Sequence, residues 1–234
     1  DGTPLPAATA SQDTDEGDDA HMAARLRPVT HSRMLRPRYL AAAGALLFAA
    51  GVVAFMGIIT AEALYPEGYS TSLNAISDLG ATEPPDSVIE EPSATIFNTV
   101  MMVTGVLLLL SSFFLQYGTR RWAAAVFAAL FGLGALGVGI FPGDTGAIHA
   151  LFALLTFIAG GIAAIVAYSV TTAPFRYFSV VLGAVALVVL VLYFALGDSS
   201  PLAPLGMGGV ERWVAYPIVL WTLGFGGHLM GRAR

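Results

Sequence analysis

The chain has 234 residues, of which 56% are hydrophobic and only 12% are charged, too few charges to cover a water-soluble globule of this size. The absence of cysteine excludes disulfides, thiolate catalysis and cysteine-based metal sites. The formal net charge of −5 is unevenly distributed, because six of the sixteen acids lie within the first nineteen residues. Composition therefore favours a membrane protein preceded by an acidic segment.

Residues 1–38 are rich in Pro, Thr, Ser and acids and poor in large apolar side chains. Such a segment cannot bury enough surface to offset the loss of chain entropy, so we expect it to be disordered. Because the chain starts with Asp1, the first residues are compatible with a fragment, a tag or a processed end. Met22 and Met34 are both candidate native starts.

Six long apolar runs follow, each with about 19 or more residues free of charge, enough for a helix of roughly 30 Å, the thickness of a hydrocarbon core. We predict an all-α fold, a polytopic integral membrane protein with a six-transmembrane-helix bundle in residues 39–232. The predicted spans are 39–64, 93–116, 122–141, 146–170, 175–196 and 211–231.

Ten of the eleven basic residues, all arginines, lie before the first span, in alternate gaps or after the last span. The remaining gaps hold acids and only Arg212. Since basic loops stay in the cytoplasm, this pattern predicts a multi-pass protein of the cell membrane with both termini cytoplasmic.

The first gap, residues 65–92, is the only long one. Within it Leu73, Ile76 and Leu79 recur at helical spacing, which predicts a short helix lying at the outer membrane interface. Residues 83–92, with three prolines and four acids, indicate a solvated turn region. Glycines crowd the third, fourth and sixth spans, which should pack closely at the centre, whereas the fifth span should face lipid.

Ionisable groups are costly inside a bilayer, so their positions give the best functional evidence. Most of them lie at the predicted outer ends of the spans, where they suggest a polar pocket. The candidate ligand-binding residues are Glu62, Asp78, Asn98, Asp144, His149, Glu211 and Arg212.

Several of these residues also have a structural interpretation. Asp144 is well placed to cap the fourth helix, and Glu211 can simply pair with Arg212. His149 can donate to a carbonyl. Glu62 lies where the helix dipole disfavours an anion, so it needs a partner, for which Arg212 and His149 are the candidates.

No catalytic signature is present, and we expect no catalytic residue, no metal site and no cofactor. His149 and His228 would lie about 20 Å apart in depth at helical rise, too far to share an ion. An enzyme activity stays open but has no support in the residues.

Four motifs carry a family resemblance: Glu62-Ala-Leu-Tyr-Pro66, Asn74-Ala-Ile-Ser-Asp-Leu-Gly80 with Phe97-Asn98, Phe141-Pro142 before His149, and Glu211-Arg-Trp-Val-Ala-Tyr-Pro217. Together they resemble the membrane family known as domain of unknown function 998, over about residues 39–231. The resemblance implies a six-helix membrane protein and brings no activity with it. The segment 76–80, with Pro84-Pro85, is also similar to the Frag1, DRAM and Sfk1 family, which implies lipid-related work.

The leading hypothesis is that a polar pocket on the extracytoplasmic side binds a small molecule or a lipid head group. Arg212 would contact the anionic part of a ligand or neutralise Asp78 or Glu62. The alternatives are a proton- or cation-coupled transporter, an intramembrane lipid-modifying enzyme and a structural membrane protein. Membrane lipid is the expected partner, nucleic acid is not expected, and the oligomeric state stays open.

Overall fold

The computed structural model describes residues 2–3 and 32–233 of the chain. The predicted disordered segment, residues 1–38, falls largely outside these residues, so its disorder stays a prediction. The first helix begins at Ser32, before the predicted span at residue 39. The bundle that follows is described by itself.

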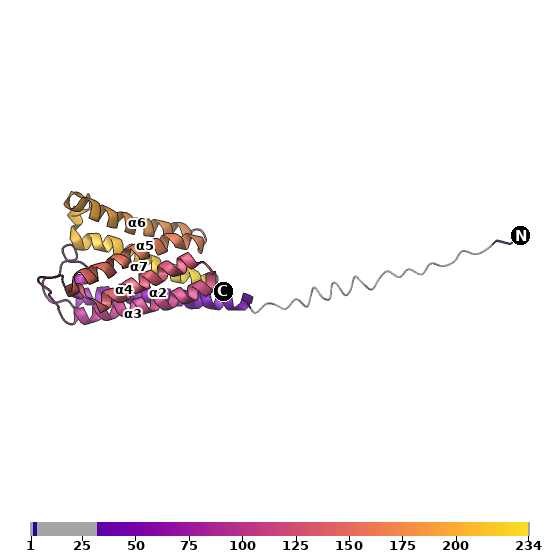
Figure 1. Cartoon of the computed structure of the whole chain (residues 1–234), viewed down its shortest axis with the longest axis horizontal. Coiled ribbons are helices and arrows are strands. Elements are labelled where there is room, and N and C mark those ends of the chain that lie inside the picture. The colour runs from indigo at the N-terminus through magenta and orange to yellow at the C-terminus, as the bar shows by residue number, and fades with distance from the viewer. Residues whose placement is uncertain (1, 4–31, 234) are drawn as a thin grey trace. The chain divides into compact units, whose positions relative to one another are not determined.

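Six long helices form the bundle, in agreement with the six predicted spans (Figure 1). Their bounds are α2 Ser32–Ala63, α3 Ser93–Thr119, α4 Trp122–Ile140, α5 Ala147–Val166, α6 Phe175–Leu196 and α7 Gly206–Arg232. Short 3-10 turns, Ser77–Leu79 (η1), Gly143–Thr145 (η2), Ala167–Ser169 (η3), Gly197–Ser199 (η4) and Ala203–Leu205 (η5), lie in the connections. The described residues contain no strand.

Five of these helices, α2 to α6, are long and apolar enough to cross a membrane. The sixth, α7, is 27 residues long but carries Glu211, Arg212, Pro217 and His228, which lower its hydropathy. The start of α2 and the end of α7 meet at one end of the bundle, where Arg36 and Arg232 line the same cleft. The chain is thus an all-α multi-pass membrane protein, as predicted.

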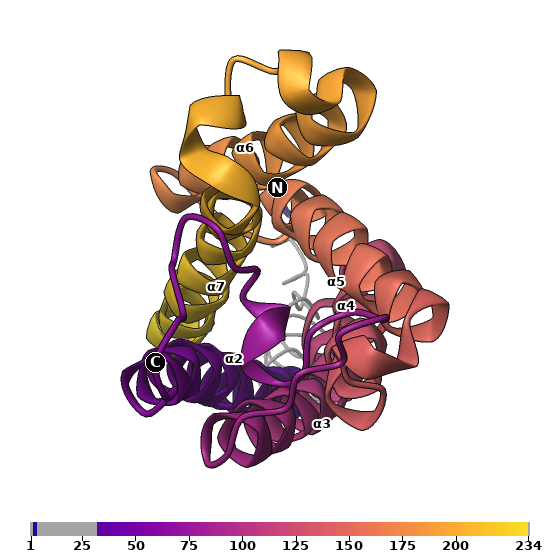
Figure 2. The same ribbon diagram turned by 90° about the vertical axis from the view of Figure 1, so that its left-hand side faces the viewer.

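Consecutive helices pack against each other from α3 to α7, and α2 closes the bundle between α3 and α7 (Figure 2). The α2–α7 crossing is close because Gly44 and Gly226 face each other. A Cβ on Gly44 would lie 2.7 Å from the Gly226 carbonyl oxygen, and one on Gly226 would lie 2.6 Å from that of Gly44. Small residues therefore allow the backbone contact, as expected for helices in lipid.

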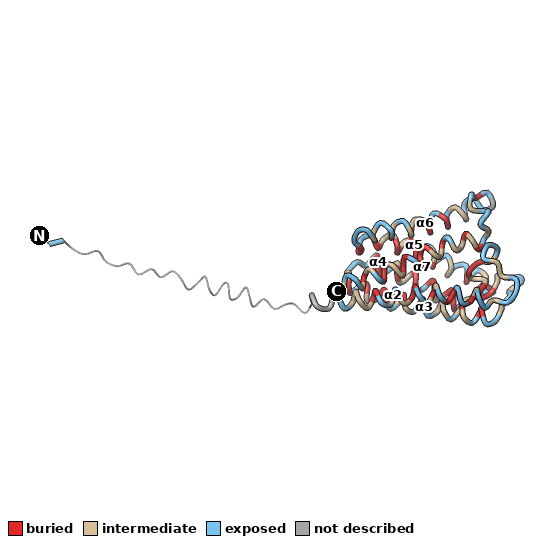
Figure 3. Tube along the Cα trace, turned by 180° about the vertical axis from the view of Figure 1, so that it is seen from behind, coloured by how far each residue is buried: buried red, intermediate tan, exposed pale blue. Residues whose placement is uncertain are grey.

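Buried and exposed residues alternate along the helices (Figure 3), and many of the exposed ones are large apolar residues. Among the five apolar helices, α4 is the most enclosed, and α3 and α6 are the least. The α6 surface leaves Val181, Val188, Val191 and Phe194 exposed. This agrees with the prediction that the fifth span faces lipid.

Two glycines of the sixth span take no part in close packing. A Cβ on Gly227 or Gly231 would have no atom within 4 Å. In α4, by contrast, Gly132, Gly134 and Gly139 each lie against the backbone of a neighbouring helix. Close packing through small residues therefore involves α4 and one face of α7, and it extends to glycines of the other helices, such as Gly105 of α3 and Gly183 of α6.

The first loop enters the mouth of the bundle instead of lying on the interface (Figure 2). Ile76 and Leu79 are buried and pack with Ile58, Phe97 and Val138, whereas Leu73 is 72% exposed. Only η1 is helical in the segment that carries them. The predicted interfacial helix is therefore wrong, because these apolar residues plug the bundle and do not share one face.

Candidate functional site

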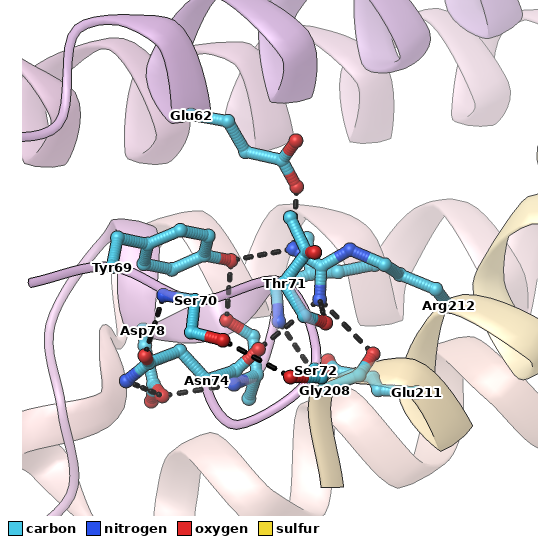
Figure 4. A network of polar contacts seen from close by, with 12 residues as sticks. Glu62, Tyr69, Ser70, Thr71, Ser72, Asn74, Asp78, Gly208, Glu211 and Arg212 are labelled. Carbon is cyan, nitrogen blue, oxygen red and sulfur yellow. Dashed lines mark hydrogen bonds and ion pairs between the residues drawn. The ribbon is translucent and has the colours of Figure 1, made fainter. Parts of the chain in front are cut away.

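Arg212 connects the first loop to the first and last helices (Figure 4). Its Nη2 donates to Glu62 Oε1 at 2.5 Å and to the Tyr69 hydroxyl at 2.7 Å. Its Nη1 lies within hydrogen-bond distance of the backbone oxygens of Thr71, at 2.9 Å, Asn74, at 3.1 Å, and Gly208, at 3.0 Å. Both terminal nitrogens of the guanidinium are thus fully used within the protein.

The ion pair decides the two predictions about the partners of Glu62 and Glu211. Glu62 has the partner that its place near the end of α2 requires, and that partner is Arg212. The expected pairing of Glu211 with Arg212 is wrong, because Glu211 Oε2 accepts the backbone N–H of Ile76 at 2.6 Å instead. Glu211 therefore fixes the buried part of the loop to α7.

The loop is also held by its own side chains. Asp78 Oδ2 accepts the Ala75 N–H at 2.9 Å and lies 3.4 Å from Asn74 Nδ2. Asn74 Oδ1 accepts the Ser70 N–H, and the Tyr69 hydroxyl donates to Ala75 O. Burial raises the pKa of Asp78, and the hydrogen bonds from Asn74 and Ala75 counteract the rise only in part.

Tyr69 shows the same effect of enclosure. Burial raises the pKa of its hydroxyl, although the contact with Arg212 works in the opposite direction. The phenol stays protonated and can donate to Ala75 O while it accepts from Arg212. The loop network is thus a set of satisfied bonds that leaves little for a ligand.

Asn98 and Asp144 lie beside the loop without joining this network. Asn98 Nδ2 donates to Gly80 O at 3.4 Å, while its Oδ1 is buried without a hydrogen-bond partner among the described residues. Asp144 does not cap α5, the helix of the fourth predicted span, so that prediction is wrong. The N-cap of α5 is Gly146, whose φ of 61° follows the η2 turn, and Asp144 Oδ1 is buried without a described partner.

His149 is 3% exposed and bonds as the sequence suggested. Its Nδ1 lies 2.8 Å from the Phe141 carbonyl oxygen. A carbonyl can only accept, so Nδ1 carries a proton, and in the neutral ring Nε2 is an acceptor. Nε2 is buried and has no hydrogen-bond partner among the described residues.

Two cavities adjoin the loop, and His149 lines one of them. The side cavity, about 160 Å³, lies between α5, α6, α7 and the loop, and Glu83, His149, Tyr193 and Glu211 are among its lining residues. The core cavity, about 70 Å³, is lined mainly by apolar residues and by Thr104, whose buried hydroxyl oxygen has no described partner. The two cavities have four lining residues in common, Ser77, Ala153, Phe157 and Glu211.

Only part of the predicted pocket set meets in one cavity. His149 and Glu211 line the side cavity, whereas Glu62, Asp78, Asn98, Asp144 and Arg212 do not. The predicted set does not include Ser77 or Glu83, although both line the side cavity, and the sequence pattern assigns Glu83 to a solvated turn. No periodic signal marks either residue, because their position depends on how the loop folds back onto the bundle.

The comparisons with known proteins give one match. Residues 33–228 match the family described as "Protein of unknown function (DUF998)". This range runs from the first turn of α2 into the last turns of α7 and includes every candidate site residue. No curated protein and no solved structure matches the chain. The similarity to the Frag1, DRAM and Sfk1 family stays a prediction.

Proposed function

The chain belongs to the family described as "Protein of unknown function (DUF998)", and on that premise we propose that it binds an amphipathic molecule with a hydrogen-bond-donating head group in the side cavity. The observation that carries this proposal is the buried, unpartnered Nε2 of His149. A buried acceptor without a donor costs about 1–3 kcal/mol, and a ligand donor would recover that cost.

The charge of the lining favours a cationic or hydroxyl-bearing head group over an anionic one. Glu83 and Glu211 line the cavity together with His149, and none of the described lining residues is an arginine. Arg212, the residue expected to contact an anion, has its terminal nitrogens committed to Glu62, Tyr69 and backbone oxygens. An ammonium or hydroxyl group therefore suits the cavity better than a phosphate.

The size and surroundings of the cavity favour a molecule that also has an apolar part. A volume of about 160 Å³ is below the roughly 300 Å³ at which drug-sized pockets begin, so it suits a head group alone. The rim includes Leu154, Phe194 and Met207, which are exposed on the apolar outside of the bundle. An acyl chain could lie against this surface while its head group enters between the helices.

The arginine distribution indicates the membrane side of this site. All the described arginines except Arg212 belong to the opposite end of the bundle. By the positive-inside rule, we infer that the side cavity opens in the extracytoplasmic half of the membrane. A lipid head group of that leaflet, or a small amphipathic amine, is the proposed ligand.

A pair of lipids that differ in donor capacity tests the proposal. Purified full-length protein would be titrated with short-chain phosphatidylethanolamine, whose ammonium has N–H donors, and with short-chain phosphatidylcholine, whose quaternary ammonium has none. We expect the ethanolamine lipid to bind about 10-fold more tightly, the effect of one charge-assisted hydrogen bond. Equal affinities for the two lipids would refute the proposal.

Variants then test whether the preference for the ethanolamine lipid depends on the side cavity. His149→Phe should abolish it, and Glu83→Gln, a change at the exposed rim, should reduce it without affecting the fold. His228→Phe is the matched control, because it removes a histidine that stacks on Phe175 and lines neither the side nor the core cavity. A preference that survives both His149→Phe and Glu83→Gln in folded protein would place the lipid elsewhere.

A further inference from the structure

The end of the bundle opposite the loop carries a concentration of positive charge. Arg36, Arg38, Arg120, Arg121, Arg176 and Arg232 all lie at this arginine end, at helix starts, helix ends or the short turns between helices. All ten acids of the described residues from 32 onward lie in the opposite half of the bundle or its loops: Glu62, Glu67, Asp78, Glu83, Asp86, Glu90, Glu91, Asp144, Asp198 and Glu211. Within the described part of the chain, every charged side chain at the arginine end is therefore positive.

Three of these arginines line one cleft. The cleft has a volume of about 360 Å³ and brings together Arg36 of α2, Arg121 between α3 and α4, and Arg232 of α7. It is also lined by Thr119 and by residues 169–172, and no acid is found among its described lining residues. We call it the basic cleft.

The arginines of the basic cleft differ from Arg212 in how their donors are used. Among the described residues, neither the Arg36 nor the Arg121 side chain has a hydrogen-bond partner, and Arg232 donates from Nη1 to Val170 O. The Thr119, Ser169 and Thr171 hydroxyls donate to carbonyl oxygens within their own helices or turns. The donors that remain for an anion in this cleft are therefore the Thr172 hydroxyl and the guanidinium groups, and guanidinium groups suit phosphate oxygens.

The residues around the cleft favour a lipid over a dissolved ion. Four exposed tyrosine and tryptophan residues lie at the same end of the bundle, Tyr117, Trp122, Tyr168 and Tyr177. Tyrosine and tryptophan concentrate at the level of lipid head groups. Leu40 and Val170 add apolar walls to the cleft, against which the start of an acyl chain could lie.

We propose that the basic cleft binds the phosphate of an anionic phospholipid head group, at a site separate from the side cavity. Arg36 and Arg121 would contact the phosphate oxygens, with Arg232 beside them. The arginine end would face the leaflet in which anionic lipids create a negative surface potential. This binding would hold α2, the α3–α4 turn and α7 to one lipid molecule.

Binding to purified full-length protein tests the proposal with three probes: short-chain phosphatidylglycerol, phosphatidylcholine of the same chain length, and inorganic phosphate. We expect phosphatidylglycerol to bind at least about 10-fold more tightly than either of the others. Equal binding of inorganic phosphate would make the ligand a dissolved ion and overturn the lipid assignment. Equal binding of phosphatidylcholine would show that charge recognition is absent.

Two double variants separate the cleft from general surface charge. Arg36→Gln/Arg121→Gln removes the two arginines without described side-chain bonds and should weaken phosphatidylglycerol binding by about 10-fold or more. Arg38→Gln/Arg120→Gln removes the same charge from the same two regions, and neither residue lines the basic cleft. Equal losses in both variants, or a loss in neither, would overturn the proposal; unchanged thermal unfolding would confirm that both variants are folded.

Discussion

Glu62 and Arg212 are 150 positions apart in the chain and form an ion pair with 2.5 Å between the carboxylate oxygen and the guanidinium nitrogen. Their side chains are only 21% and 11% exposed. Because Arg212 also contacts Tyr69 and three backbone oxygens, the pair holds the loop against α2 and α7 at once.

Removing one partner of this pair should destabilise the protein strongly. Arg212→Ala leaves a largely buried carboxylate and two loop carbonyls, those of Thr71 and Asn74, without this donor, and we expect a loss of about 3–5 kcal/mol. The measurement is thermal or denaturant unfolding of the purified protein. In a double-mutant cycle with Glu62→Gln, the two losses should be clearly less than additive. Additive losses would mean that the two groups do not interact.

The α2–α7 crossing should not tolerate a single added methyl group. Gly226→Ala places a Cβ 2.6 Å from the Gly44 carbonyl oxygen and should cost about 1–3 kcal/mol by overpacking. Gly227→Ala, at the neighbouring position with no atom within 4 Å, is the matched control and should leave stability unchanged or higher. Comparable unfolding temperatures for the two variants would contradict the close contact.

Asp78 should give the stability a recognisable pH dependence. Its pKa in the folded protein is raised above the ordinary value of 3.8 by burial, so the folded state holds the proton more tightly than the unfolded state. Stability from this group is therefore present at pH below 3.8 and is lost as the pH rises through the raised pKa. The difference in unfolding temperature between wild type and Asp78→Asn, followed against pH, should show this change. A constant difference would argue against the burial effect.

The membrane orientation can be tested by labelling, because the chain has no cysteine of its own. Asp86→Cys in the first loop and Ala173→Cys at the arginine end both introduce a thiol at an exposed position. With a membrane-impermeant maleimide on intact cells, we expect labelling at residue 86 only, and labelling at residue 173 only after permeabilisation. The reverse pattern would invert the topology.

Sequence patterns predicted the helices well because a membrane span depends on a long apolar run and little else. The start of α4 at Trp122 and both ends of α6, Phe175 and Leu196, lie where the pattern put them. Likewise, the general cost of an anion at a helix end was enough to predict that Glu62 has a partner.

The structure of the loop could not be predicted in this way, because it is set by contacts between residues that are far apart in the chain. The spacing of Leu73, Ile76 and Leu79 is compatible with a helix, but Glu211 accepts the Ile76 N–H and pulls the segment inward. The η2 turn likewise gives the N-cap of α5 to Gly146, not to Asp144. The side cavity therefore includes Glu83 and Ser77, which no local pattern singles out.

The link between Glu62 and Arg212 also has a consequence for how the protein is made. A ribosome produces the carboxylate and the loop long before it produces the guanidinium, which lies near the start of the last helix. Until that helix emerges, the loop's carbonyl oxygens at Thr71 and Asn74 lack their mature donor. The loop-bearing end of the bundle is thus completed last, and a nascent chain cut short before α7 would lack the donor that holds the loop.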